Sequence, residues 1–341
     1  MEVEMKKKVL ALALALSMVF VLTACGGGGD SGSAGGGDAE YNWKMALNGQ
    51  EGDNAYDYGV FFKDKIEELT EGKVAVELYG GAQLGDTTEV LEGMSEGVAD
   101  IMVESVGTLA PFSDLANIEA MPYMINSKEH FDAVWEGEVG DELKEEIGKD
   151  AGFKLLGASY RGPRIVTATK EMKTVDDFKG FKLRTPDLDM YVKTWKWMGA
   201  APTPLGMSET YTAIQQKTVD GQENPLASSL SFSLDEVCDY WIKTNHVYGC
   251  NVVIMDREYF EGLPEDIQAA VEEAAEWAGE QTSAQQEKLD AESEQQLKDD
   301  GKKVIEVDTD AFAKHFEGFA ESEFPDFADW VKKIKDADPS K

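Results

Sequence analysis

The amino-acid sequence predicts an α/β fold divided into two lobes, and three observations carry this prediction. Strand-like segments with alternating apolar residues and helix-like segments with apolar residues three and four apart follow one another along the chain. The folded part, from about residue 40 to 341, is long for a single hydrophobic core. An Ala/Glu/Gln-rich stretch from Pro264 to Gly301 contains few helix breakers and is long enough to bridge two lobes.

The first 24 residues have the pattern of a secretory signal peptide. Three lysines at 6–8 precede an apolar run from Val9 to Leu22, which is too short to span a membrane comfortably. The run is followed by Leu-Thr-Ala-Cys, which resembles the bacterial lipobox. This resemblance implies that Cys25 becomes the lipid-modified first residue of the mature protein. We therefore expect an extracytoplasmic protein, anchored to the cell membrane through Cys25.

Residues 25–40 are predicted to form a tether. They contain "GGGGDSGSAGGGD", a composition that buries no core and behaves as flexible coil. No later segment has an unbroken apolar run long enough to cross a bilayer. The pattern predicts a folded domain held at a membrane surface.

The elements of the first half follow in a regular order. "YNWKMAL" and "VAVELYG" alternate as strands do, and apolar residues at helical spacing lie between them up to Gly72. Asp86 offers an N-cap for a short helix that ends at Gly97, and the buried strand "VADIMVE" then delivers Glu104. Further strands are predicted at residues 153–158, 164–168, 181–185 and 252–255.

Two parts of the sequence show a weak internal similarity. "TEVLEGMSEG" followed by "VADIMVES" and "SETYTAIQQK" followed by "TVDGQENP" each run from an amphipathic helix through a tight turn and a short strand to a polar residue. That residue is Glu104 in the first case and Asn224 in the second. Two similar lobes that each present a polar group at a strand's carboxyl end would meet at a cleft.

Arginine is scarce and clustered. The chain has a net charge of −34, which argues against nucleic acid or anionic lipid as a partner. It contains only four arginines, and three of them (Arg161, Arg164 and Arg184) fall within 24 consecutive residues. Guanidinium grips a carboxylate with two parallel hydrogen bonds, whereas ammonium is a point charge. The cluster therefore indicates an anion site, with chance clustering on the surface as the alternative.

Arg184 is the best placed of the three. In "FKLRTP" the strand ends at Pro186, so Arg184 lies at a carboxyl end, where open α/β sheets bind their ligands. Catalytic patterns are lacking: the three histidines are widely separated, and no nucleophile elbow, P-loop or dinucleotide fingerprint is present. We expect no catalytic residue, cofactor or metal ion. Cys238 and Cys250 are either a disulfide or two buried thiols, and the second alternative is favoured.

Several motifs occur together in a characteristic order. They are "GAQLGD", "EGVADIMVES", "RGPR", "DDFKGFKLRTPD", "GAAPTPLGMSETYTAIQQKTVDGQENP", "KTNH" and "YFEGLPEDIQ". Over residues 42 to 336 the chain closely resembles the DctP-type solute-binding subunits of tripartite ATP-independent periplasmic (TRAP) transporters. It is most similar to members that bind sialic acid and related sugar acids.

This resemblance implies a periplasmic-binding-protein-like fold that closes on its ligand. Lobe one would comprise residues 41–161 and 250–289, and lobe two residues 162–249 and 290–341, joined by hinge strands and a long helix. Arg184 would form a salt bridge with the substrate carboxylate, and Arg164 and Asn224 would complete that site. Glu104 would accept hydrogen bonds from substrate hydroxyls, with Asn48 and Asp86 nearby. The liganded protein, expected to be a monomer, would dock on a sodium-driven TRAP permease.

Two residues depart from the sialate-binding pattern. Asp187 stands where those members have Asn, and Met207 stands where they have an aromatic residue before "SE". We expect a hydroxylated monocarboxylate such as a uronate or aldonate. Four-carbon dicarboxylates, a lipid-anchored glycosidase or lyase acting on acidic sugars, and a sensory protein that serves a receptor kinase are the alternatives.

Overall fold

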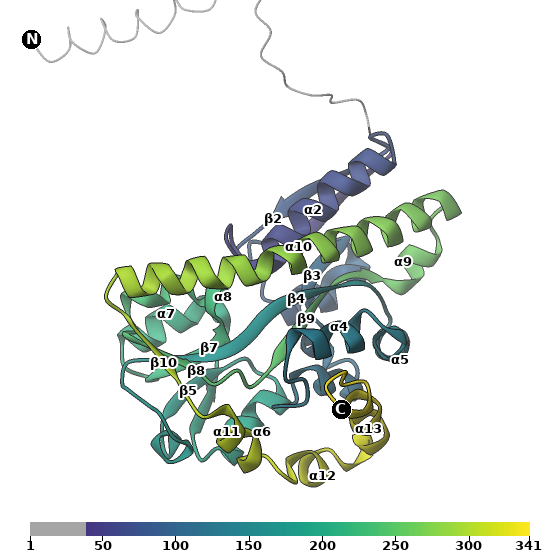
Figure 1. The fold of residues 1–341 in the computed structure, drawn as a ribbon. Helices are drawn as coiled ribbons and strands as arrows, with labels where there is room; N and C mark the ends of the chain where they lie inside the picture. The colour runs from purple at the N-terminus through teal and green to yellow at the C-terminus, as the bar shows by residue number, and fades with distance from the viewer. Residues whose placement is uncertain (1–38) are drawn as a thin grey trace, which may run out of the picture. The chain divides into compact units, whose positions relative to one another are not determined.

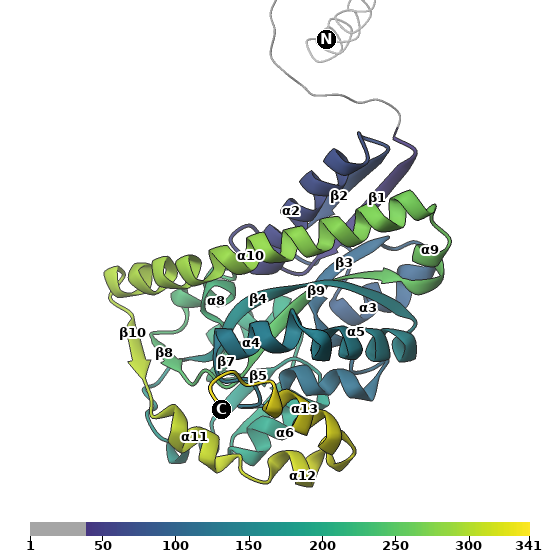
Figure 2. The ribbon, with the colours of Figure 1, turned by 45° about the vertical axis from the view of Figure 1, so that its right-hand side comes forward.

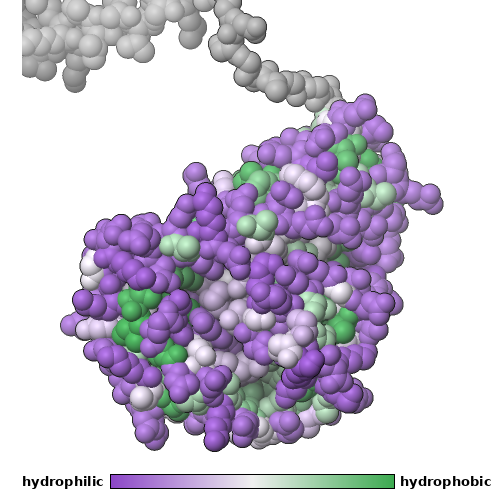
Figure 3. Space-filling view, viewed as in Figure 1, coloured by the Kyte–Doolittle hydropathy of each residue, from purple (hydrophilic) through white to green (hydrophobic). Residues whose placement is uncertain are grey.

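The computed structural model describes residues 39–341 (Figures 1 and 2). The predicted signal peptide, Cys25 and nearly all of the predicted tether lie outside the described residues. Within the described part, no helix has the length and apolar character needed to cross a membrane. The face drawn in Figure 3 is mainly hydrophilic, in keeping with the large excess of carboxylates in the sequence.

Strands and helices alternate in the first part of the chain, as predicted. The elements are β1 (Tyr41–Leu47), α2 (Asn54–Leu69), β2 (Val74–Tyr79), α3 (Thr87–Gly93) and β3 (Ile101–Ser105). The side chain of Asp53 caps α2 by accepting a hydrogen bond from an amide in its first turn. Tyr58, Phe62 and Ile66, four residues apart, are fully buried against the sheet. Asp86 occupies the N-cap of α3, as predicted.

Ten strands form the sheet system, in the order β2-β1-β3-β9-β4-β7-β5-β6, with β8 beside β4 and β10 beside β8. The remaining strands are β4 (Phe153–Ala168), β5 (Lys182–Thr185), β6 (Ala201–Pro204), β7 (Gly221–Pro225), β8 (Tyr240–Lys243), β9 (Tyr248–Asp256) and β10 (Lys303–Glu306). Strand β4 belongs to both halves of the system. It pairs with β9 as far as Pro163 and with β7 and β8 from Arg164 onward.

The two strands predicted at residues 153–158 and 164–168 are one strand of 16 residues, β4. Its pairing with β9 shifts register in two places, and at each place a glycine has positive φ: Gly157 (64°) and Gly162 (79°). Glycine adopts this conformation without a Cβ penalty. The glycines and Pro163 therefore bend the strand where the sequence pattern predicts a break.

Helix α10 (Glu265–Asp299) confirms the long helix predicted from composition. Its 35 residues extend about 50 Å. It contacts α2 along its first half, β4 near its middle and β10 near its C-terminal end (Figures 1 and 2). The approach to β4 is close, because a Cβ on Gly279 would lie 2.2 Å from the carbonyl oxygen of Ala158. Glycine at this position lets the helix backbone pack directly on the strand shared by both halves.

The other helices cover the sheets and complete the chain. They are α4 (Lys128–Trp135), α5 (Glu138–Ala151), α6 (Asp189–Trp197), α7 (Met207–Gln215), α8 (Leu226–Ser231), α9 (Arg257–Glu261), α11 (Thr309–His315), α12 (Phe319–Glu323) and α13 (Ala328–Asp336). The last of them, α13, returns to α4, where His130 Nε2 lies 2.8 Å from the carbonyl oxygen of Ile334. Helix α4 belongs to the residues predicted for lobe one and α13 to those predicted for lobe two. The C-terminal segment therefore contacts residues of the other predicted lobe. The lobe boundaries themselves stay a prediction.

The two cysteines in the described part are free and buried. Cys238 lies in a small cluster with Ile214 and Leu234, whereas Cys250 belongs to the main core on β9. The structure therefore contains two buried thiols, which is the alternative favoured from the sequence.

Candidate ligand-binding site

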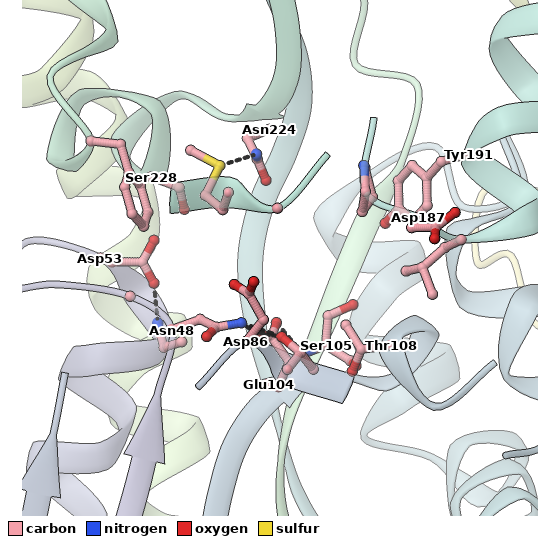
Figure 4. A pocket seen from close by; sticks show the side chains of 18 of the residues that line it. Asn48, Asp53, Asp86, Glu104, Ser105, Thr108, Asp187, Tyr191, Asn224 and Ser228 are labelled. Atoms are coloured by element: carbon pink, nitrogen blue, oxygen red, sulfur yellow. Dashed lines mark hydrogen bonds between the residues drawn. The ribbon is translucent and has the colours of Figure 1, made fainter. Parts of the chain in front are cut away.

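A cavity of about 300 Å³ lies where the ends of several strands and helices converge (Figure 4). All eight residues predicted as ligand contacts line it: Asn48, Asp86, Glu104, Arg164, Arg184, Asp187, Met207 and Asn224. In Figure 4, Asn224 and Ser228 lie on one side of the cavity and Asn48, Asp86 and Glu104 on the opposite side. The structure thus brings the predicted residues together, while their contact with a ligand stays a prediction.

Arg184, on β5, is a buried cation without a carboxylate partner among the described residues. It is 4% exposed, and its Nε and Nη2 donate to the carbonyl oxygen of Leu205 at 2.9 and 2.7 Å. Its Nη1 faces only the sulfur of Met207 at 3.7 Å. Burial lowers the pKa of Arg184 to about 10, so the side chain is still protonated at neutral pH. The cavity is therefore lined by a charged guanidinium that no carboxylate of the described residues contacts directly.

Arg164, on β4, has its charge balanced by Glu223 on the neighbouring strand β7. Its Nε and Nη2 donate to the two carboxylate oxygens at 2.6 and 2.8 Å, and its guanidinium lies 4.8 Å from the ring centre of Tyr191. Two of its three nitrogens are thus taken by the protein. Arg164 lines the cavity with the remaining edge of its guanidinium.

His246 is the third member of this buried group. Its Nε2 lies 3.0 Å from Oε2 of Glu223, and its Nδ1 lies 2.9 Å from Oγ1 of Thr244. Burial lowers the pKa of His246, which favours a neutral ring that donates from Nε2 to the carboxylate and accepts from the Thr244 hydroxyl. Burial alone would raise the pKa of Glu223, but Arg164 and this hydrogen bond hold it at about 2.

Arg161 also lines the cavity and was not among the predicted contacts. It is 8% exposed, its Nε is buried without a hydrogen-bond partner among the described residues, and its Nη1 lies 4.0 Å from Oε1 of Glu104. The clustering of three arginines was the signal that could have found it. Arg184 was selected instead by its position at a strand end, and Arg164 by the family resemblance.

The wall opposite Asn224 consists of acceptors and hydroxyls. Oε2 of Glu104 accepts from the amide of Asn48 at 3.2 Å, and its Oε1 accepts from the amide of Ser105 at 2.8 Å. Asn48 also donates to the hydroxyl of Thr87. Asp86 reaches toward the other wall, because a Cβ on Gly206 would lie 3.1 Å from its Oδ2. This wall can accept hydrogen bonds from a polyhydroxylated molecule.

Several further lining residues carry no sequence signal of their own. Asp53, Thr87, Ser105, Thr108, Tyr191, Ser228 and Phe232 line the cavity as well. They lie in helices, at helix ends and at the end of β3, and their relative positions depend on tertiary packing. Asp187 lies on the exposed rim, next to Pro186 at the end of β5.

The fold and the cavity are those of a solute-binding protein, and the chain belongs to a known family of this class. Residues 45–322 match the family described as bacterial extracellular solute-binding protein, family 7. A solute-binding protein of Roseobacter denitrificans is 34% identical over 74% of this chain and 78% of its own length. The sialic acid-binding periplasmic protein SiaP of Vibrio cholerae is 28% identical over 79% of this chain and 84% of its own length.

Solved structures agree with this membership. A TRAP periplasmic solute-binding protein of Roseobacter denitrificans with bound L-galactonate has a TM-score of 0.82 and 30% identity over 87% of this chain and 99% of its own. One of Chromohalobacter salexigens with bound D-glucuronate has a TM-score of 0.82 and 27% identity over 86% of this chain and 99% of its own. The predicted two-lobed α/β fold and the predicted family are confirmed, and the protein is an extracytoplasmic solute-binding protein.

The Arg164–Glu223 pair predicts a specific stability profile. Glu223→Gln leaves Arg164 buried without its counter-charge, so we expect the free energy of unfolding to fall by about 3–5 kcal/mol near neutral pH. The pKa of Glu223 is lowered from its ordinary 4.5 to about 2 in the folded protein. Its contribution is therefore fully present above about pH 4.5 and is lost as pH falls through about 2. Urea unfolding at several pH values should show the difference between variant and wild type shrinking over this range.

The matched control is Glu142→Gln, which removes a carboxylate from an exposed pair with Lys333. Exposed pairs contribute about 0–1 kcal/mol, so this variant should unfold almost as the wild type does. A Glu223→Gln variant no less stable than this control would contradict the assignment.

Proposed function

We propose that this protein captures a small monocarboxylate with several hydroxyl groups, such as an aldonate or uronate. The observation that carries the proposal is the guanidinium of Arg184, buried at the cavity with no carboxylate of the described residues paired to it. A buried cation is costly unless it is paired. A ligand carboxylate would supply the missing partner, and the amide of Asn224 and the free edge of Arg164 would add donors.

The charges in the cavity favour one carboxylate over two. Arg164 is balanced by Glu223, and Arg161 faces Glu104. A second ligand carboxylate would find no uncompensated cation and would approach the acidic side chains of Asp86 and Glu104. Four-carbon dicarboxylates are therefore the weaker candidates.

The opposite wall favours hydroxyl groups on the rest of the ligand. The carboxylates of Asp53, Asp86 and Glu104 and the side-chain oxygens of Asn48 and Thr87 are acceptors there. The cavity volume of about 300 Å³ lies at the small end of ligand pockets, which suits a molecule of sugar-acid size. The sugar acids bound in the structures of relatives support the same ligand class.

Binding without turnover and delivery to a TRAP permease complete the proposal. The relatives are solute-binding proteins, which supports a carrier role over an acidic-sugar hydrolase or lyase. Closure of the two predicted lobes, 41–161 with 250–289 against 162–249 with 290–341, would bury the ligand. We propose that the carrier acts as a monomer, anchored through a lipid on Cys25, and that the permease is sodium-driven.

The first test concerns Arg184. Arg184→Ala removes one partner of a buried charge pair, which costs about 2–5 kcal/mol, or about 30- to 3,000-fold in affinity. Arg184→Lys keeps the charge but loses the planar fork, so it should recover only part of this loss. Calorimetric titration with L-galactonate and D-glucuronate measures the effect, and circular dichroism verifies that each variant is folded.

Arg257→Ala is the matched control, because Arg257 lies outside the residues that line the cavity. It should bind as the wild type does. Near-wild-type affinity of Arg184→Ala would overturn the proposed carboxylate site, and full rescue by lysine would show that charge alone is needed.

The second test concerns Glu104. Glu104→Gln replaces an anionic acceptor by a neutral amide, so hydroxylated acids should lose about tenfold or more in affinity, the scale of one hydrogen bond to a charged group. A plain acid such as propionate should lose much less. The measured quantity is the ratio of the D-glucuronate and propionate affinities in variant and wild type. An unchanged ratio would remove Glu104 from hydroxyl recognition.

The third test concerns Cys25. If Cys25 carries the lipid, Cys25→Ser should move the protein from the membrane fraction to the soluble fraction of the cell without altering its ligand affinity. Fractionation followed by immunoblotting measures this. Retention of the variant in the membrane fraction would contradict the lipid anchor.

A further inference from the structure

Met207 differs from every other methionine in the described part of the chain. Nine of the ten methionines there are buried, between 0% and 7% exposed: Met45, Met94, Met102, Met121, Met124, Met172, Met190, Met198 and Met255. Met207 alone is partly exposed, and it lines the ligand cavity at the first residue of α7. Its thioether is therefore the one that a small solute oxidant reaches most directly.

The sulfur of Met207 occupies the position where the ligand carboxylate would bind. It lies 3.7 Å from Nη1 of Arg184 and 3.6 Å from Nδ2 of Asn224, and Figure 4 draws the second of these contacts. Nδ2 of Asn224 also donates to Oε1 of Gln222 at 2.8 Å, so one of its two hydrogens is left for the sulfur. Thioether sulfur is a weak acceptor, and a carboxylate can displace it from both donors. The same two donors are those that the proposed function assigns to the ligand.

Oxidation would turn this weak acceptor into a strong one. A peroxide transfers one oxygen to the sulfur: the O–O bond breaks, an S–O bond forms, the thioether is oxidised to the sulfoxide and hydrogen peroxide is reduced to water. The S···N distances exceed a normal N–H···O distance of about 2.9 Å. An oxygen on the sulfur that points between Arg184 and Asn224 would lie nearer to both nitrogens without any movement of either residue.

We propose that Met207 is a peroxide-oxidation site whose sulfoxide oxygen takes the hydrogen bonds of Arg184 and Asn224 and so closes the cavity to carboxylates. The modification is reversible, because methionine sulfoxide reductases restore the thioether. The effect on binding rests on the proposed function, whereas the selectivity of oxidation does not. Sulfoxides at the nine buried positions would disturb the core instead of the site.

The first measurement is independent of any ligand. The full-length protein is treated with increasing hydrogen peroxide, and peptide mapping by mass spectrometry follows each of the ten methionines between residues 39 and 341. Met207 should oxidise before the other nine, including Met124, which at 7% is the most exposed of the buried set. Oxidation of any of the nine before Met207 would overturn the proposal.

The second measurement follows binding of D-glucuronate and L-galactonate before and after peroxide. Wild-type affinity should fall by about ten- to a hundredfold, the scale of one hydrogen bond to a charged donor, and return after reductase treatment. The affinity of the Met207→Leu variant is measured before and after peroxide treatment and should not change. Met124→Leu is the matched control and should stay as peroxide-sensitive as the wild type.

The outcomes separate the two proposals. Two outcomes would overturn the proposed oxidation switch at Met207 and leave the binding function intact. One is ligand binding that survives complete oxidation of Met207, and the other is a Met207→Leu variant whose affinity is as peroxide-sensitive as that of the wild type. If the untreated protein binds neither acid, the proposed function fails. The effect of Met207 oxidation is then tested by thermal unfolding. Oxidation should shift the melting temperature of the wild type upward relative to the shift that it causes in the Arg184→Ala variant. Equal shifts in the two proteins would overturn it.

Discussion

The rest of the site depends on the guanidinium of Arg184, which is buried at the cavity with no carboxylate of the described residues paired directly to it. Arg184 lies at the carboxyl end of β5, where Leu205 takes two of its nitrogens and only a sulfur faces the third. In a low-dielectric cavity such a charge is unfavourable until an anion arrives. In the proposed function, a ligand carboxylate supplies this partner. Arg164, by contrast, pairs with Glu223, which is also hydrogen-bonded to His246, and this pair connects the neighbouring strands β4 and β7.

The different environments of the arginines explain how the proposed acid ligand can bind to a chain with 66 acidic residues. Exposed carboxylates act through solvent and salt, which screen them beyond about 10 Å at moderate ionic strength. The arginines act at contact distance and out of water, where a charge pair is far stronger. Local geometry therefore outweighs net charge. The same carboxylate-rich composition supplies the acceptors Glu104 and Asp86 on the opposite wall.

Strand β4 and helix α10 connect the two halves of the molecule. β4 pairs with β9 over its first part and with β7 and β8 over its last part, so Arg161 and Arg164 lie near the point where it passes from one group of strands to the other. Positive φ at Gly157 and Gly162 bends the strand there. Arg161 and Arg164 therefore line the cavity beside the place where β4 changes its pairing partners.

The sequence by itself determined the alternation of strands and helices, the long helix α10, and the position of Arg184 at a strand end. Hydrophobic periodicity, helix caps and helix breakers are local signals, so they can be read from short stretches of the sequence. Only the tertiary structure decided that Gly157 and Gly162 bend one strand where the pattern indicated two, because a positive φ is compatible with either a bend or an end. It also decided that Glu223, and not a ligand, neutralises Arg164, and that Arg161 joins the cavity. Partners 59 residues apart meet only when β4 and β7 pair, and no local pattern specifies that register.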